Sequence, residues 1–136
     1  MIDKTFLRNL EYKITGACIE VHKNLGSGLL ESIYHKCLKI ELELKGINFI
    51  SENIINVKYK GITLNTELRA DFFIENCLIV EIKSVEKVLP IHEAQILTYM
   101  KLLNAPKGLL INFNCMNIIQ NGKKSFVNEF YYPLLE

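Results

Sequence analysis

The sequence predicts an α/β protein, because segments with helical and with strand periodicity follow one another along its 136 residues. Two amphipathic helices come first, several short strands follow, and a third helix leads into a continuous apolar run that begins at Gly108. Such a run after a crossover helix is typical of a buried strand that could be parallel to its neighbour. We expect one domain over residues 1–136, since this length suits one core and is too short for two ordinary domains.

Composition and charge narrow the class of protein. A hydrophobic content of 49% with 23% charged residues is typical of globular proteins, and no apolar run approaches the roughly 18 residues of a membrane span. The first residues have helical periodicity where a secretory signal would have an apolar stretch. The four cysteines lie far apart, without zinc-site spacing, as in proteins of reducing compartments. We therefore expect a soluble, cytoplasmic protein, whose net charge of +1 requires a local patch for any nucleic-acid partner.

Two helices open the chain. The first should run from Asp3 to about Leu25 and end at Gly26, where a glycine suits a C-terminal cap. The second should run from about Leu30 to Lys45. Its apolar face is expected to consist of Ile33, Cys37, Ile40 and Leu44.

Glu31 and Tyr34 occupy the start of the second helix. An acidic residue in the first turn most simply complements the helix dipole, which is worth a few tenths of a kcal/mol to about 1 kcal/mol. Tyr34, three residues later, could be an ordinary core residue. Taken alone, Glu31 is more easily explained by the dipole than by catalysis.

Short strands follow Gly46, and we expect them to form an antiparallel meander with a turn at Lys60-Gly61. Lys58 and Lys60 share one strand face. Such a pair usually belongs to a solvated face, and contact with phosphate is its less common role. Further along, residues 121–124 predict a turn with a small basic cluster, followed by a closing strand or tail.

Charged residues interrupt an apolar hairpin between Arg69 and Ser84. Asp71 lies on the first strand, and Glu81 and Lys83 lie on the second, where a core strand would carry Val or Ile. A charge inside an apolar strand is costly unless it is paired, hydrogen-bonded or bound to a metal. Glu81 and Lys83 share a face by the period of two, so the hairpin predicts a site.

The turn of this hairpin decides whether Asp71 joins them. A two-residue loop would pair Asp71 with Val80, on the wrong side, whereas a three-residue loop of Glu75, Asn76 and Cys77 pairs Asp71 with Glu81. Asn76 tolerates the left-handed conformation that the longer loop needs. We therefore predict the three-residue loop or an equivalent bulge.

The third helix should begin at Pro90 and end before Asn104. His92, Gln95 and Tyr99 form a polar stripe along one side of it. The other side consists of Ile91, Ala94, Thr98 and Leu102. Because this helix follows directly from the strand with Glu81 and Lys83, we expect it to pack near the ends of that hairpin.

Two converging carboxylates with a nearby ammonium suit a divalent cation with oxygen ligands. Mg²⁺ takes one or two protein carboxylates and leaves room for water and phosphate oxygens. Lys83 could orient or deprotonate a water, or neutralise charge on a phosphorane. This chemistry points to phosphodiester hydrolysis. A structural network of ion pairs with Lys83 and Arg69 explains the hairpin alone equally well.

A family resemblance favours the first explanation. Residues 28–34, Gly-Leu-Leu-Glu-Ser-Ile-Tyr, resemble the GxxExxY signature of a small-protein branch of the PD-(D/E)XK nuclease superfamily. Asp71, the Glu81-Ile82-Lys83 triplet, and residues 89–99 with Gln95 and Tyr99 are similar to the superfamily's Asp, ExK and the QxxxY element of RecB-type exonuclease domains. Residues 108–114 also resemble the family, so the likeness covers nearly the whole chain.

The resemblance implies a restriction-endonuclease-like core, in which helices flank a mixed central sheet, and a Mg²⁺- or Mn²⁺-dependent nuclease with DNA as the expected substrate. Asp71, Glu81 and the Ile82 carbonyl would ligate the metal, and Glu31 would reach it directly or through a water. Lys83 would position or activate the attacking water, and Gln95 would orient Lys83 or the phosphate.

Nucleic-acid contacts and competing functions complete the expectations. The expected contact residues are Tyr34, Lys58, Lys60, Lys87, His92, Tyr99, Lys123 and Lys124. We predict that their lysines, together with Lys83, line one groove. The alternatives are a catalytically silent nucleic-acid- or protein-binding module that keeps the fold and could form a homodimer, and a purely structural cluster of ion pairs.

Overall fold

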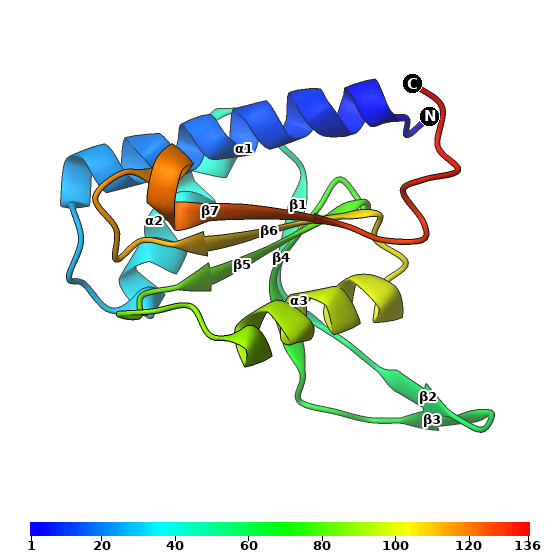
Figure 1. Ribbon diagram of the computed structural model, residues 1–136. Helices are drawn as coiled ribbons and strands as arrows, with labels where there is room; N and C mark the ends of the chain where they lie inside the picture. Colours follow the sequence, from blue (N-terminus) through cyan, green and yellow to red (C-terminus); the bar gives the residue numbers. More distant parts are fainter.

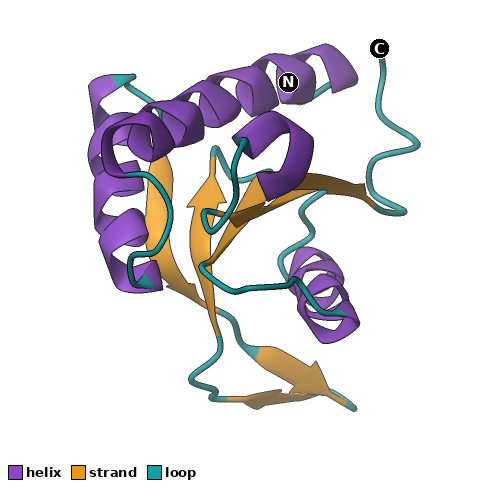
Figure 2. Cartoon of the chain, turned by 60° about the vertical axis from the view of Figure 1, so that its left-hand side comes forward, coloured by secondary structure: helices purple, strands orange, loops and turns teal.

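Helices cover both faces of a five-stranded sheet in the computed structural model, which describes residues 1–136 (Figure 1). The strand order is β1-β4-β5-β6-β7, and a separate two-stranded sheet is formed by β2 and β3. Helices α1 and α2 lie on one face, and α3 lies on the other (Figure 2). The predicted mixed sheet flanked by helices is confirmed. No helix is both long and apolar enough to cross a membrane.

Helix α1 spans Lys4–Leu25, as its sequence predicts. The Asp3 side chain caps its start by accepting a hydrogen bond from the Phe6 N–H at 2.7 Å. Gly26 ends it with φ +72°, a conformation that favours glycine, and donates its N–H to the His22 carbonyl. The apolar stripe of the helix packs on the sheet. Its buried members are Leu7, Leu10, Ile14, Ala17, Cys18 and Val21.

Helix α2 spans Glu31–Leu44, but its predicted apolar face is wrong. The buried residues are Tyr34, Leu38 and Leu42, whereas the predicted face of Ile33, Cys37, Ile40 and Leu44 is half-buried or exposed. Two apolar stripes run along this helix, and α1 and the sheet bury the one that contains the large Tyr34 ring. Helical periodicity identifies both stripes and does not choose between them.

The predicted meander is only partly correct. β1 (Phe49–Ile54) pairs antiparallel with β4 (Arg69–Ile74), while β2 (Val57–Tyr59) and β3 (Ile62–Leu64) pair with each other. The turn at Lys60-Gly61 forms as expected, with positive φ at both residues. Because β1 bonds to β4 and not to β2, the β2–β3 hairpin projects from the sheet as a separate ribbon (Figure 1).

A crossover connects the central strands. β5 (Leu78–Lys83) and β6 (Lys107–Asn112) are parallel and are joined by α3 (Pro90–Leu102), and β7 (Lys123–Val127) pairs antiparallel with β6. The side of α3 that buries Ile96, Tyr99 and Met100 packs on Ile79 and Leu110 of the sheet. The polar stripe therefore faces the sheet. The side with Ile91, Ala94 and Thr98 faces solvent.

The predicted turn at residues 121–124 takes a different form. Residues Ile118–Gly122 form a single π-helical turn, and β7 begins directly at Lys123. Gly122 does not have a positive φ. A Cβ atom built on Gly122 would lie 2.9 Å from the Asn112 carbonyl oxygen and 2.7 Å from Cys115 Sγ. Close approach of neighbouring atoms therefore explains this glycine.

Gly122→Ala should lower the free energy of unfolding by about 1–3 kcal/mol, because the added methyl group meets a backbone oxygen that cannot move freely. Gly108→Ala is the matched control, since the atoms nearest to its Cβ would be side-chain atoms of Met100 and Ile96, which can rotate, and none of them is a backbone atom. Urea unfolding of both variants measures the difference. An equal loss at the two positions would contradict the close-approach explanation.

Candidate active site

The β4–β5 hairpin has the three-residue connection that the sequence predicts. Ile74 pairs with Leu78, Phe73 with Ile79 and Phe72 with Val80, which leaves three residues in the turn. These are Glu75, Asn76 and Cys77. Glu75 and Asn76 have φ of 51° and 54°. This register places Asp71 opposite Glu81, on the face of the sheet that α3 covers.

Side-chain hydrogen bonds tie Asp71 and Glu81 together beyond the last regular pair. The Asp71 N–H donates to Glu81 Oε2 at 2.6 Å, and the Ile82 N–H donates to Asp71 Oδ2 at 2.7 Å. Glu81 is only 5% exposed, and Asp71 is partly buried. The hairpin therefore holds two carboxylates side by side within the protein.

The electrostatics of this pair are unfavourable without a cation. Burial raises the pKa of Glu81, and the negative charge of Asp71 adds to this effect. Burial also raises the pKa of Asp71, despite the hydrogen bond from Ile82. None of the four ion pairs of the structure includes either carboxylate. The alternative explanation of the hairpin, a structural network of ion pairs, therefore does not apply to these two residues. Both carboxylates are free to bind a positive ion.

Glu31 and Lys83 lie at the same end of β5. Ser84 Oγ donates a 2.6 Å hydrogen bond to the Leu29 carbonyl and so ties the end of β5 to the loop before α2. Burial raises the pKa of Glu31, while the charge of Lys83 lowers it and that of Asp71 raises it. The Glu31 residue as a whole is still mostly exposed to solvent. Nowhere in the structure do three His, Cys, Asp or Glu side chains lie close enough together to hold a metal ion by themselves.

Tyr34 supports the site from the core and does not face solvent. It is fully buried and stacks on Phe113, with the ring centroids 4.5 Å apart. Its hydroxyl donates to the Gly26 carbonyl at 2.7 Å and accepts from the Leu29 N–H at 3.2 Å. The expected direct contact with nucleic acid is therefore wrong. Both hydrogen bonds are to the backbone of the loop that leads to Glu31, so Tyr34 holds this loop in place.

Gln95, Tyr99 and His92 approach the site from α3. Gln95 Nε2 donates to the Tyr99 hydroxyl at 3.0 Å, and burial together with the negative charge of Glu81 raises the pKa of Tyr99. Tyr99 is 6% exposed, so it lies beneath the site surface. His92 Nδ1 accepts a hydrogen bond from the Leu89 N–H and caps the start of α3.

Two residues near Asp71 were not predicted from the sequence as parts of the site. His35 and Glu52 both act on the pKa of Asp71, the first lowering it and the second raising it. The His35 ring stacks on Phe72 at 4.4 Å, and its Nε2 lies 2.7 Å from Ser51 Oγ. His35 follows Glu31 by one helical turn, so the i, i+4 spacing could have indicated it. Glu52 gave no comparable signal.

The expected lysines do not line one groove. Successive side chains of β7 point to opposite faces of the sheet, so Lys123 pairs with Glu11 of α1 at 2.9 Å and Lys124 pairs with Glu93 of α3 at 2.9 Å. Lys123 therefore lies on the face opposite Asp71 and Glu81. Lys58 and Lys60 belong to the projecting ribbon, and Lys87 is exposed in the segment after β5.

Comparison with known proteins adds independent information. A family model described as "PD-(D/E)XK nuclease superfamily" matches residues 8–125. A solved structure described as "Crystal structure of SSO0001" is similar, with a TM-score of 0.54 and 27% sequence identity. The match covers 72% of this chain and 50% of the solved chain, so this chain spans about half the length of that protein. No curated protein matches the sequence.

Proposed function

The chain belongs to the PD-(D/E)XK nuclease superfamily, and on this premise we propose that it is a metal-dependent nuclease that hydrolyses phosphodiester bonds in DNA. The observation that carries the proposal is the pair of carboxylates of Asp71 and Glu81, which the backbone N–H groups of Ile82 and Asp71 hold side by side. Nucleases of this superfamily generally use divalent metal ions. We further propose that residues 1–136 form one domain and that residues 28–34 place the chain in the GxxExxY branch.

The residues at the end of the hairpin fit a Mg²⁺ or Mn²⁺ ion. Two carboxylates without an ion-pair partner offer oxygen donors, which these ions prefer. The Ile82 N–H points toward Asp71, and the Ile82 carbonyl leaves the strand at the same edge, so it is the third ligand in our proposal. Glu31 would contribute directly or through a water. When bound, the ion would act as a Lewis acid on the phosphate and on the attacking water.

Lys83 and Gln95 have supporting roles in this proposal. Lys83 follows Glu81 by two residues on the same strand face and forms no ion pair, so its ammonium group is available to a phosphate oxygen or to the attacking water. Gln95 would orient the phosphate or Lys83, and its hydrogen bond to Tyr99 holds the amide group in place. Lys58, Lys60, Lys87 and His92 would contact the DNA backbone.

Lys83→Ala is expected to lower metal-dependent DNA cleavage by about 10²–10³-fold, because the variant loses a positive charge at the reacting phosphate. Cleavage is measured on single-stranded, duplex and branched DNA with Mg²⁺ or Mn²⁺. Lys101→Ala, which removes an exposed lysine at the far end of α3, is the matched control and should keep full activity. Unchanged cleavage in Lys83→Ala would contradict the proposed role. Salt-dependent binding of the wild-type protein without any hydrolysis would favour the silent binding module.

A further inference from the structure

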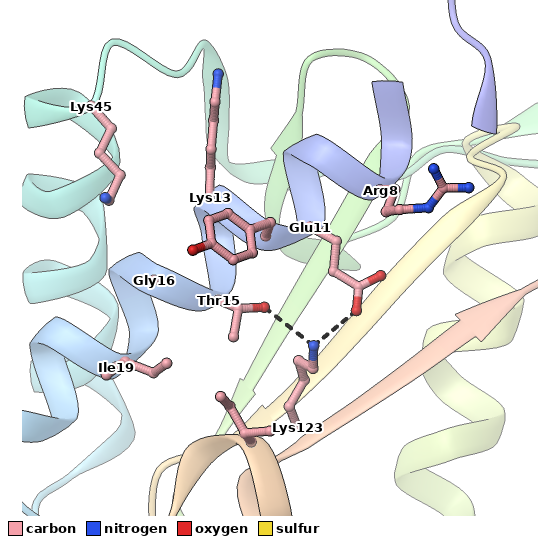
Figure 3. Close-up of a pocket in the computed structure, with 10 residues that line it drawn as sticks. Arg8, Glu11, Lys13, Thr15, Gly16, Ile19, Lys45 and Lys123 are labelled. Atoms are coloured by element: carbon pink, nitrogen blue, oxygen red, sulfur yellow. Dashed lines mark hydrogen bonds and ion pairs between the residues drawn. The ribbon is translucent and has the colours of Figure 1, made fainter. Parts of the chain in front are cut away.

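A hollow lies along α1, on the face of the sheet opposite the Asp71–Glu81 pair. It has a volume of about 640 Å³ and is partly open to solvent, and Figure 3 shows the residues that line it. We call it the basic hollow and define it by the charged residues of its wall, namely Arg8, Glu11, Lys13, Lys45 and Lys123. It is separated from the Asp71–Glu81 pair by the sheet, because Lys123 points to α1 and Glu81 points to α3.

The charges of the basic hollow do not balance. Arg8, Lys13 and Lys45 form no ion pair. The Lys45 side chain reaches from the end of α2 toward Gly16 of α1 (Figure 3). The Arg8 side chain extends away from Lys13 and Lys45, so these two lysines are the cations that could share one anion (Figure 3). A bound anion would relieve the repulsion between their charges.

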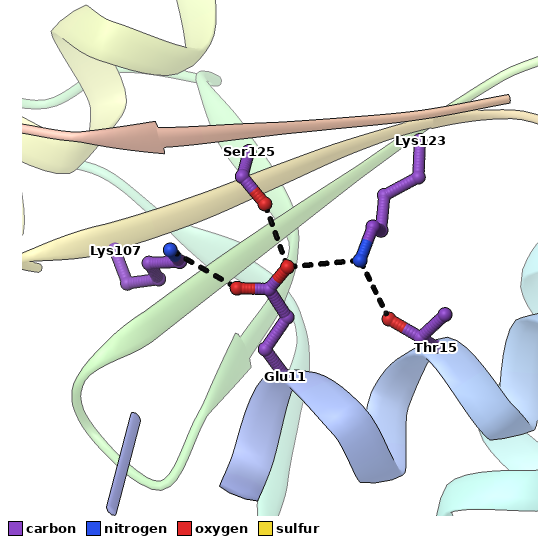
Figure 4. A network of polar contacts seen from close by, with 5 residues as sticks. All are labelled: Glu11, Thr15, Lys107, Lys123 and Ser125. Atoms are coloured by element: carbon purple, nitrogen blue, oxygen red, sulfur yellow. Dashed lines mark hydrogen bonds and ion pairs between the residues drawn. The ribbon is translucent and has the colours of Figure 1, made fainter. Parts of the chain in front are cut away.

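The one acidic residue of the wall does not offset these cations. Both carboxylate oxygens of Glu11 are occupied, because Lys107 lies 3.0 Å from Oε1 while Lys123 and Ser125 bond to Oε2 at 2.9 and 2.7 Å (Figure 4). These partners carry two positive charges against one negative charge. An anion between Lys13 and Lys45 would therefore meet two unpaired lysines and a carboxylate whose charge is already neutralised.

The remaining wall offers a surface for a flat, apolar group. Tyr12 is 81% exposed and lines the hollow beside Ile19 and Ile119, which are also exposed. An exposed aromatic ring next to cations is the arrangement on which nucleobases stack while their phosphates are held. The volume falls within the roughly 300–1,000 Å³ of pockets that hold small organic molecules, so there is space for more than a bare phosphate.

We propose that the basic hollow binds a nucleoside phosphate. Lys13 and Lys45 would hold the phosphate group, and Tyr12 would stack on the base. This site does not depend on the proposed nuclease activity, because it shares no residue with the Asp71–Glu81 pair and needs no metal.

Calorimetric titration with the four ribonucleoside monophosphates tests the proposal. It is done in EDTA, so that the Asp71–Glu81 pair cannot bind nucleotide through a metal. We expect at least one nucleotide to bind, with an affinity that decreases as salt increases. The double variant Lys13→Ala/Lys45→Ala should bind at least tenfold more weakly. Lys23→Ala, which removes an exposed lysine of α1 outside the hollow, and Glu81→Ala should bind like the wild-type protein.

Four outcomes would overturn the proposal. These are no binding of any of the four nucleotides, inorganic phosphate binding as tightly as the best nucleotide, binding of a short oligonucleotide only, and unchanged binding in the double variant. Tyr12→Ala separates the two parts of the site, since it should weaken nucleotide binding and leave phosphate binding unaltered. Circular dichroism of each variant verifies that it is folded. Failure of this test leaves cleavage and metal binding at Glu81 unaffected, so it is distinguishable from failure of the nuclease proposal.

Discussion

Glu81→Gln should abolish metal-dependent cleavage, by at least about 10²–10³-fold, and at the same time stabilise the metal-free protein by about 1 kcal/mol, or about 3 °C in Tm. Glutamine keeps the size of the side chain and can accept the hydrogen bond from the Asp71 N–H. It replaces a carboxyl group whose ionisation burial and the negative charge of Asp71 oppose, as the raised pKa of Glu81 shows, by a neutral amide. A gain in stability with a loss of function is typical of residues that are retained for binding or catalysis.

The two effects are measured on the same protein samples. Thermal unfolding in EDTA gives the stability, and cleavage with Mn²⁺ gives the activity. Glu86→Gln is the matched control, because Glu86 is an exposed acid shortly after the same strand and should change neither value. A variant that loses stability and keeps cleavage would show that Glu81 has a structural role.

Glu11→Gln should lower the free energy of unfolding by about 3 kcal/mol at pH 7, the largest loss of stability we predict for a single charged residue. Burial alone would raise the pKa of Glu11, but hydrogen bonds from Lys123, Ser125 and Lys107 outweigh it and lower the pKa from 4.5 to about 2. Each unit of such a shift corresponds to about 1.4 kcal/mol. The variant also leaves two largely buried lysines without a carboxylate partner.

This contribution depends on pH in a defined direction. The pKa of Glu11 is lower in the folded protein than in the unfolded chain, so the stabilisation is complete above the unfolded value of 4.5 and is lost as the pH falls toward about 2. Urea unfolding of the wild type and of Glu11→Gln should differ by about 3 kcal/mol at pH 7, and by much less near pH 2.5. Glu20→Gln, an exposed change on the same helix, should show a small difference at both pH values. A difference that is independent of pH would contradict this account of the network.

Local sequence signals predicted the parts of the fold that local interactions determine. The bounds of α1 follow from its capping residues, Asp3 and Gly26. The three-residue turn follows from the tolerance of Asn76 for positive φ and from the spacing of Asp71 and Glu81. These features depend on residues close together in the chain, so a single sequence contains the information.

Features that depend on distant partners were predicted incorrectly or missed. Lys123 pairs with Glu11, which lies 112 residues away in the chain. The sequence does not show this partner, so the positive charge of Lys123 led to the prediction of a nucleic-acid contact. The core face of α2 depends on the stacking of Tyr34 on Phe113. His35 acquires its position near Asp71 only when α2 packs beside β4. In each case, tertiary packing chose between alternatives that the local pattern left equal.

A crystal of the protein soaked in Mn²⁺ tests the central claim most directly. The anomalous signal of the ion should appear between Asp71 and Glu81, with carboxylate oxygens of both residues and the Ile82 carbonyl oxygen at about 2.0–2.3 Å. The signal should be absent from crystals of Glu81→Gln. No bound ion at this pair in the wild-type protein, or an ion coordinated elsewhere while the pair remains free, would contradict the proposed metal site and the nuclease mechanism built on it.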